Sequence, residues 1–477
     1  MPFEPLSLVS PEAVERLHGA SLHILARVGV EVRHEEARRL LGGVGAEVHD
    51  DSPMVHLPEA VVEHALAVAG KGHTLCGRAR ERTAPFGGGA ANFLSTAGQA
   101  HWVDMIAGTR RPATLADAQT GIRLGDALPH IGIVGAMATP SDLPVASREV
   151  RLVAELLQGT TKPIACWVTS GPAAQYVVRL LEAVTGGADE LRRYPPMEGF
   201  YEAVSPLRLA SAGMDALFEL TRAGLPIGLG PMAMACATAP ATLAGTVAQE
   251  NAEILASLVL VQATRPGTCV TYWGIPHVMD PATGLCSFGS PEQGLMAAVM
   301  AQLARRYGLP CGLNVALADS CTADAQAGVE KATGLMLGLL AGADVFGHQG
   351  IAGADQGASL DQLVVDDELA GMARRIHRGL AVDEEAIALE VIERVGPGGH
   401  YLTDPHTAAH FRQELWFPTL FARRRWDDWV TSGQRTALQA ARERSDHLLA
   451  THEPEPMAED LRRELEAIVA DAERSLS

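Results

Sequence analysis

The chain has 477 residues, of which 47% are hydrophobic and 20% are charged, a balance typical of a globular protein with ample core material. It carries 38 Lys and Arg against 57 Asp and Glu, so its formal net charge is −19. Such a chain repels phosphate backbones, which argues against nucleic acid as a partner.

The N-terminal sequence and the cysteines indicate a cytoplasmic protein. The start, "MPFEPLSLVSPEAV", has neither the basic nor the apolar region of a signal peptide. No run approaches about eighteen uninterrupted apolar residues, so we expect no membrane span. The seven cysteines are dispersed without a C-x-x-C pair, as expected for reduced thiols that mostly pack in the core.

Residues 1–85 are predicted to form an N-terminal helical segment. Apolar residues recur at helical spacing over 11–30, and two further helices are predicted at about 34–41 and 58–68.

Residues 86–355 contain eight apolar runs of strand length that alternate with helical stretches. The runs are "ANFLSTAG", "HIGIVGAMATP", "PIACWVTSG", "MEGFYEAVSPL", "PIGLGPMAMA", "CVTYWGIPHVM", "PCGLNVALADS" and "ADVFGHQG". This alternation, with a spacing of roughly 30–45 residues, is typical of a parallel α/β barrel, the TIM (β/α)8 barrel. An open doubly wound sheet would share the local pattern, but no G-x-G-x-x-G opens a helix after a strand. The barrel is therefore favoured.

Residues 356–477 are predicted to form a C-terminal helical extension packed on the barrel. It includes "HYLTDPHTAAHFRQELWFP", in which His406 and His410 would share one helix face. Asp404 is suited to cap this helix and Pro405 to be its first residue. A metal site or a catalytic pair would need further ligands or partners, and none is close in sequence. We therefore interpret the stretch as a packed junction.

Candidate binding residues lie where the predicted strands end, because barrel active sites form at the C-terminal ends of the strands. Trp167, Tyr272, Trp273 and Phe346 fall at such ends, although only 5% of the chain is aromatic. Ring faces that converge on one mouth suit a cation without N–H donors, such as a quaternary ammonium. The same rings could instead plug the barrel end as core.

Polar residues at the same strand ends complete the candidate substrate-binding set: Glu202, Asn314, His348 and Gln349. His348 could contact a substrate carboxylate or amine, or it could be a hydrogen-bonded residue of the barrel top. Cys321 and His348 could be imagined as zinc ligands, but no further ligand lies at a familiar spacing. We predict no metal site, and no residue is assigned as a catalytic nucleophile, acid or base.

With these residues collected, the chain resembles the trimethylamine methyltransferase superfamily, in the branch without pyrrolysine whose characterised members demethylate glycine betaine and related quaternary amines. The resemblance spans nearly the whole chain. It is carried by "ILARVGVEVRHEEARRLLGGVGAEV", "GTRRPATLADAQTGIRLGDALPHI", "GPMAMACATAPATLAGTVAQENAEILASLVLVQATRPGTCV", "DAQAGVEKATGLMLGLLAGADVF", "SLDQLVVDDELAGMARRIHRGL" and the histidine-containing stretch quoted above.

The resemblance implies a TIM barrel and a cytoplasmic enzyme that moves a methyl group from a quaternary amine to the Co(I) of a separate corrinoid protein. It implies that no cofactor is bound tightly, since the partner supplies the corrinoid (cobalamin), and we also expect a homo-oligomer. Pyrrolysine-bearing members carry that residue near the end of strand seven, where this chain has only Ala316, Leu317 and Ala318. A mechanism specific for trimethylamine is therefore not implied.

Two alternatives remain open. The barrel could bind betaine-like ligands without turnover, or it could be a zinc-dependent corrinoid methyltransferase that uses a thiolate such as Cys321.

Overall fold

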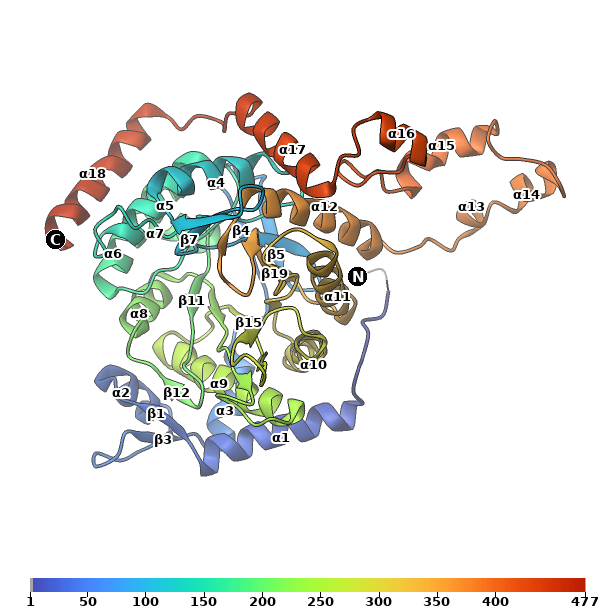
Figure 1. The fold of residues 1–477 in the computed structure, drawn as a ribbon. Helices are drawn as coiled ribbons and strands as arrows, with labels where there is room; N and C mark the ends of the chain where they lie inside the picture. The colour runs from blue at the N-terminus through green and yellow to red at the C-terminus, as the bar shows by residue number, and fades with distance from the viewer. Residues whose placement is uncertain (1–2, 477) are drawn as a thin grey trace.

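The centre of the molecule is a ring of eight short parallel strands surrounded by helices (Figure 1). The structure, a computed structural model, describes residues 3–476. The ring strands are β6 (Asn92–Ser95), β9 (Val134–Gly135), β10 (Ile164–Ala165), β11 (Gly199–Tyr201), β13 (Ile227–Leu229), β15 (Val270–Gly274), β18 (Cys311–Leu313) and β19 (Val345–Gln349). Each falls inside one of the eight apolar runs, so the predicted TIM barrel is confirmed.

Hydrogen bonds close the ring. Six strands form one parallel sheet in the order β11-β13-β15-β18-β19-β6, which places the last strand beside the first. β9 pairs with β10, and a bridge between Leu94 and Ile133 joins β6 to β9. Between β10 and β11, Ile164 N donates to Pro196 O at 2.9 Å. Closure removes free sheet edges and turns the side chains of alternate residues into a common interior.

One helix follows each barrel strand and packs its apolar face on the ring. These helices are α4 (Leu115–Ala127), α5 (Arg148–Gly159), α6 (Gly171–Thr185), α8 (Met214–Ala223), α9 (Leu243–Thr264), α10 (Pro291–Tyr307), α11 (Ala325–Ala341) and α12 (Leu360–His377); the short α7 (Ala188–Arg193) follows α6. The predicted domain boundary at 355/356 falls before α12. The structure places α12 in the ring, where it contacts β19, α11 and α4.

The N-terminal segment has the three predicted helices, α1 (Pro11–Arg27), α2 (Glu35–Gly43) and α3 (Glu59–Val68), but it also contains strands. They are β1 (Val30–Val32), β2 (Glu47–Val48), β3 (Met54–His56), β4 (His73–Cys76) and β5 (Thr83–Phe86). The sequence reading named the three helices and missed these strands, because strands of two to four residues are too short to show an alternating pattern. β1 also pairs in parallel with β12 (Arg208–Leu209), which follows β11 in the barrel.

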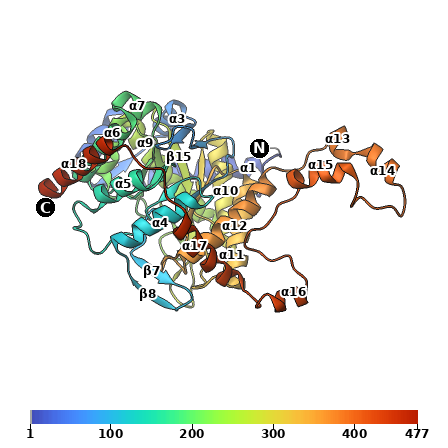
Figure 2. The ribbon, with the colours of Figure 1, turned by 90° about the horizontal axis from the view of Figure 1, so that it is seen from above.

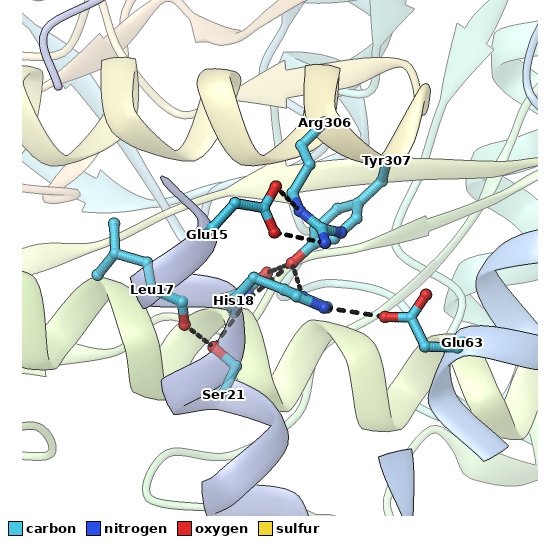
Figure 3. Close-up of polar contacts among 8 residues, drawn as sticks. Glu15, Leu17, His18, Ser21, Glu63, Arg306 and Tyr307 are labelled. Atoms are coloured by element: carbon cyan, nitrogen blue, oxygen red, sulfur yellow. Dashed lines mark hydrogen bonds and ion pairs between the residues drawn. The ribbon is translucent and has the colours of Figure 1, made fainter. Parts of the chain in front are cut away.

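A polar network docks α1 against the outside of the barrel (Figure 3). His18 lies between two partners, with Nδ1 2.9 Å from Tyr307 Oη and Nε2 2.9 Å from Glu63 Oε1. Glu15 accepts two hydrogen bonds from Arg306, at 2.7 and 2.8 Å. Burial lowers the pKa of His18, and the nearby Arg306 charge adds to this effect. The N-terminal segment is thus joined to α10 of the barrel by a buried contact of His18 and by an exposed ion pair of Glu15.

Short strands and hairpins surround the barrel mouth, which lies at the C-terminal ends of the ring strands. They are β7 (His101–Asp104), β8 (Thr109–Pro112), β14 (Met234–Ala235), β16 (His277–Met279), β17 (Cys286–Ser287), β20 (Ile351–Ala352) and β21 (Gly357–Ala358). At the opposite end, the β4–β5 hairpin supplies Leu75 and Phe86 to an apolar cluster inside the ring. The hairpin therefore closes the end of the interior that lies opposite the mouth.

The C-terminal region is helical, as predicted. Its helices are α13 (Glu384–Ile387), α14 (Leu389–Val395), α15 (Pro405–Glu414), α16 (Trp426–Thr431), α17 (Ala437–Thr451) and α18 (Glu459–Leu476). Asp404 caps α15 by accepting from His406 N at 2.9 Å, and Pro405 is its first residue, which confirms the predicted helix start. α17 packs on α12 and α4, and α18 packs on α5 and α6. No helix within residues 3–476 is long and apolar enough to cross a membrane.

The end of the barrel depends on a buried ion pair between its last two helices. Lys331 Nζ lies 3.2 Å from Asp366 Oδ2, and the two side chains are 1% and 0% exposed. Lys331 also donates to Ala316 O at 2.9 Å, and Asp366 accepts from Gly350 N at 2.7 Å. The pair therefore joins α11 and α12 to the loops that follow β18 and β19.

Removing one partner of this pair should destabilise the protein strongly. Lys331→Met leaves the Asp366 carboxylate buried without its cation, so we expect the free energy of unfolding to fall by about 3–5 kcal/mol in urea titrations. Adding Asp366→Asn to Lys331→Met should recover part of that loss. Arg179→Met removes an exposed ion pair to Asp471 and is the control, which should change stability little. If Lys331→Met and Arg179→Met lowered the free energy of unfolding equally, the buried pair would contribute no more than an exposed one.

Candidate active site

Four ring side chains from four different strands surround a cavity inside the barrel. Trp167 follows β10, Phe200 lies on β11, Trp273 on β15 and His348 on β19. Each ring contacts the next: the centroids of Trp167 and Phe200 are 5.2 Å apart, those of Phe200 and Trp273 5.9 Å, those of Trp273 and His348 6.1 Å and those of His348 and Trp167 5.4 Å. We call these four residues the aromatic box. It combines three predicted site residues with Phe200, which was not predicted.

The alternation of β15 decides which of its aromatic residues enters the box. Trp273 faces the interior, where it is 2% exposed. Tyr272 faces the surrounding helices and donates from Oη to Asn251 Oδ1 on α9 at 2.8 Å. Asn251 donates in turn to Tyr307 Oη at 2.9 Å and so belongs to the network that docks α1. Tyr272 therefore does not line the cavity predicted for it.

Phe346 also lies on the outer face of the ring. Its ring stacks on Phe93 at a centroid distance of 5.4 Å, and it packs toward Gly338 on α11. The expectation that four aromatic residues at strand ends surround one point is thus wrong for Tyr272 and Phe346. Adjacent strand residues point to opposite faces, and the sequence did not show which face is the interior.

Glycines on neighbouring strands make room for the Trp273 indole. A Cβ atom at Gly312 on β18 would lie 2.3 Å from Trp273 Cδ2, and one at Gly228 on β13 would lie 2.9 Å from Nε1. A Cβ at Gly230 would lie 2.7 Å from the Trp273 Cβ. Real carbon atoms do not approach so closely, so the large ring is compatible only with strands that carry no side chain at these inward positions.

Glu198 fixes the orientation of the indole. Its Oε1 accepts from Trp273 Nε1 at 3.0 Å, and its Oε2 accepts from Thr271 Oγ1 at 2.8 Å. Burial raises the pKa of Glu198 to about 7, although both hydrogen bonds act in the opposite direction. Glu198 was not predicted, yet a signal exists in "MEGFYEAV": Glu198, Phe200 and Glu202 alternate, as residues on one face of a strand do.

Two histidines contact the cavity region as neutral rings. Burial lowers the pKa of both His73 and His348 to about 4. His73 stacks on Phe86 at 4.5 Å, and its Nε2 lies 3.9 Å from Glu198 Oε2, which is too long for a hydrogen bond. His348 Nδ1 is buried and has no hydrogen-bond partner among the described residues. Such an unpaired atom beside a cavity is free to bond a ligand.

Two carboxylates lie above the box, at the mouth. Glu202 follows β11 two residues after Phe200, and Asp355 lies in the loop between β20 and β21. Burial and the charge of Asp355 raise the pKa of Glu202, and burial also raises the pKa of Asp355. Both side chains are nevertheless accessible to solvent.

The remaining predicted residues lie near the same end of the barrel. Asn314 directly follows β18, and its buried Oδ1 has no hydrogen-bond partner among the described residues. Gln349 is 1% exposed and donates from Nε2 to Phe346 O at 3.3 Å, so its amide is directed at its own strand. Cys321, the thiol of the zinc alternative, is exposed. Within residues 3–476, no three His, Cys, Asp or Glu side chains converge as a metal site would require.

Comparison with known proteins assigns the chain to a family. The sequence model of trimethylamine methyltransferase (MTTB) matches residues 1–477. The chain belongs to this family. It is 32% identical to a glycine betaine methyltransferase of Desulfitobacterium hafniense over 469 residues, covering 97% of this chain and 96% of that protein. It is 30% identical to a trimethylamine methyltransferase of the same species, covering 97% and 93%.

Solved structures support the fold. The monomethylamine methyltransferase of Methanosarcina barkeri superposes with a TM-score of 0.50 at 12% identity and covers 92% of each chain. At this identity the likeness concerns the barrel fold alone. The family assigns methyltransferase activity to the chain.

The raised pKa of Glu198 predicts how stability depends on pH. The unfolded carboxyl titrates near 4.5 and the folded one near 7, so its contribution is fully present below about pH 4.5 and is lost as pH rises through 7. Glu198→Gln keeps a neutral partner for Trp273. The free energy of unfolding of the wild type should therefore fall between pH 4.5 and pH 8, whereas that of Glu198→Gln should not show this loss. We expect the difference between the two proteins to change by about 3 kcal/mol in favour of Glu198→Gln over this range.

Urea unfolding at several pH values between 4.5 and 8 measures this difference. Glu81→Gln, at an exposed turn, is the control and should follow the wild-type profile. Parallel profiles for wild type and Glu198→Gln would show that Glu198 ionises without cost in the folded state.

Proposed function

We propose that this methyltransferase takes a methyl group from a small quaternary amine and passes it to the Co(I) of a corrinoid held by a separate protein in the cytoplasm. The named substrates of the relatives, glycine betaine and trimethylamine, support a methylated amine as the donor. The observation that carries the proposal is the aromatic box, which closes around one cavity at the end of the barrel where the exposed Glu202 and Asp355 lie.

The aromatic box suits a cation that cannot donate a hydrogen bond. A quaternary ammonium has no N–H, so hydrogen-bond acceptors alone cannot hold it, whereas ring faces attract its positive charge. Trp273 cannot turn away, because its N–H is bonded to Glu198 and glycines enclose its ring. A box that is already in position loses little entropy when the ligand binds.

The carboxylates at the mouth favour the same class of ligand. Glu202 lies near Asp355, and the two like charges oppose ionisation of the pair. A cation between them and the box would relieve that repulsion, so its binding would lower the pKa of Glu202. The mouth thus attracts cations before they reach the rings.

The chain's own residues orient the amine and exclude water, rather than attack the methyl carbon. Among the described residues, Cys166 is the one thiol in the cavity wall. Burial raises its pKa far above neutral, so the thiol stays protonated and is a weak nucleophile. A corrinoid, when its carrier is docked, supplies a Co(I) nucleophile from outside. The solvent access of Glu202 and Asp355 fits such an approach through the mouth.

No general acid is needed for this transfer. A quaternary nitrogen departs as a neutral amine when it loses a methyl group, so no proton has to be delivered to it. This accounts for neutral His348 and His73 in the site, since neither has to cycle through a charged state. Asn314 Oδ1 and His348 Nδ1 remain available to bond polar groups elsewhere on the substrate.

Substitution of Trp273 should weaken cation binding selectively. A desolvated cation–π contact is worth on the order of 2 kcal/mol, so Trp273→Leu should weaken binding of a trimethylammonium compound roughly thirtyfold in calorimetry. A neutral tert-butyl analogue of the same shape should lose less. Tyr272→Phe is the control, because this hydroxyl faces the helices, and it should leave both affinities unchanged. Equal losses for the charged and neutral analogues would show that the rings act by packing alone.

Methyl transfer is tested with free Co(I) cobalamin and a panel of quaternary and tertiary amines, betaines included. We expect methylcobalamin to form with at least one quaternary amine, followed by its absorbance change, together with the demethylated amine in equal amount. Formation from tertiary amines alone, or from none of the panel with either free cobalamin or corrinoid carrier proteins, would overturn the proposal.

A further inference from the structure

The cavity inside the aromatic box contains no basic side chain. Its wall consists of apolar and aromatic residues together with Cys166, Glu198 and His348, and no Lys or Arg of residues 3–476 contributes to it. His348 is neutral near pH 7, because burial lowers its pKa to about 4. A substrate carboxylate at this depth would lose its water without gaining an opposite charge, which makes its burial costly.

The loops that follow the ring strands surround the mouth with more acidic than basic side chains. They span residues 96–114, 136–147, 166–170, 202–213, 230–242, 275–290, 314–324 and 350–359, and all are described. Their basic residues are Arg110, Arg111 and Arg208, whereas their acidic residues are Asp104, Asp142, Glu202, Asp280, Asp319, Asp324 and Asp355. This excess of negative charge at the mouth repels an anionic group before it reaches the cavity.

None of the three loop arginines lines the cavity. Arg110 and Arg111 lie on β8, in a hairpin that projects beyond α4 (Figure 2). Arg110 donates to Gln356 Oε1 at 2.6 Å, and Arg111 lies 2.6 Å from Asp117 Oδ2. Arg208 is exposed on β12, beside β1 of the N-terminal segment. The arginines are thus bound to other groups or lie outside the cavity, and the interior keeps its acidic character.

Glu202 and Asp355 repel each other, and no nearby cation compensates. The charge of Asp355 adds to burial in raising the pKa of Glu202. Burial also raises the pKa of Asp355, and among the described residues no basic side chain lies close enough to lower either pKa. A carboxylate on the substrate would bring a third negative charge to this pair, whereas an ammonium group alone would relieve the repulsion.

The residues directly above the aromatic box offer hydrogen-bond acceptors. Glu202 follows Phe200 by two residues, and Phe200 contacts the Trp273 ring. Asn314 follows Gly312 by two residues, and Gly312 also lies against that ring. Because residues two apart along a strand share a face, Glu202 and Asn314 are directed to the interior on the mouth side of the box. Asn314 Oδ1, buried and unpaired within residues 3–476, needs a donor, which a hydroxyl group supplies and a carboxylate does not.

We propose that the quaternary amine demethylated by this enzyme carries an uncharged arm with a hydroxyl group, as choline does, and not the carboxylate of a betaine. The proposal rests on the proposed function and specifies its substrate. The trimethylammonium head occupies the aromatic box, and the hydroxyl donates to Asn314 Oδ1. At 32% identity, the name of the glycine betaine relative does not fix the substrate of this chain.

Demethylation of such a substrate needs no further reactant. Transfer to Co(I) breaks one N–CH3 bond, whose electron pair stays on nitrogen, and the new Co–C bond takes its electron pair from the cobalt. The other product is a neutral tertiary amine with its hydroxyl unchanged. Methylcobalamin formed from choline should therefore appear with an equal amount of N,N-dimethylethanolamine.

Binding calorimetry of choline and glycine betaine tests the proposal, because the two compounds share the trimethylammonium head and differ in the end group. Choline should bind roughly tenfold more tightly or better, since the acidic interior repels a carboxylate. The methyl ester of glycine betaine, which has neither the charge nor the hydroxyl, should bind with intermediate affinity. Equal or tighter binding of glycine betaine would overturn the proposal and leave the proposed function standing. If no quaternary amine binds, both fail.

Three variants locate the charge that selects the substrate. Glu202→Gln keeps the size of the side chain and removes its charge, so it should reduce the preference for choline several-fold. Asp280→Asn is the matched control: it removes another loop charge, in the turn between β16 and β17, and it should leave the preference unchanged. Arg148→Gln alters the first residue of α5, whose Nε is buried without a partner among the described residues. Loss of glycine betaine binding in that variant alone would identify a carboxylate site and overturn the proposal.

The salt dependence of wild-type binding gives a second measurement, in case Glu202→Gln misfolds. Salt screens the repulsion between charges at the solvated mouth, so the preference for choline should narrow between about 0.01 M and 1 M NaCl. A preference that changes neither with salt nor in Glu202→Gln would show that charge does not select the substrate, and it would overturn the proposal.

Discussion

The site depends on how a large indole is held inside a narrow closed ring of strands. A TIM barrel interior is normally filled by branched aliphatic side chains, and a tryptophan fits only where its neighbours are minimal. Here Gly228, Gly230 and Gly312 clear the space, and Glu198 accepts the indole N–H that the apolar interior would otherwise leave unpaired. Steric clearance and one hydrogen bond together fix the ring on which the aromatic box is built.

That arrangement has an electrostatic consequence. At neutral pH the cavity wall carries no positive charge: it consists of aromatic and apolar side chains, of His348, whose pKa burial lowers to about 4, and of Glu198, whose pKa of about 7 leaves it partly ionised. Two further carboxylates, Glu202 and Asp355, lie outside this cavity at the solvated mouth. Negative potential outside and polarisable faces inside form a gradient that favours a weakly hydrated cation over a strongly hydrated one.

The outer face of the same strands serves a different purpose. Tyr272 and Phe346 alternate with the cavity residues and bind the barrel to its helices, Tyr272 through Asn251 and the α1 network and Phe346 through Phe93 and α11. Neighbouring aromatic residues in one short strand thus divide between ligand cavity and structural core. Only the direction of each Cβ separates the two roles.

The sequence by itself determined the elements of the barrel, although not the short strands of the N-terminal segment. Eight apolar runs with helices between them indicate parallel strands joined by crossover helices, and the absence of a dinucleotide-binding motif favours the barrel over an open sheet. The cap of α15, formed by Asp404 and Pro405, was also predictable, since it depends on residues adjacent in sequence. Only the tertiary structure decided which residues meet. It pairs Glu198 with Trp273, excludes Tyr272 from the cavity and places α12 in the ring of helices. It also decided that residues 379–434 project from the body of the molecule (Figures 1 and 2). These depend on strand register and on contacts between residues far apart in the chain, and a linear pattern carries no record of either.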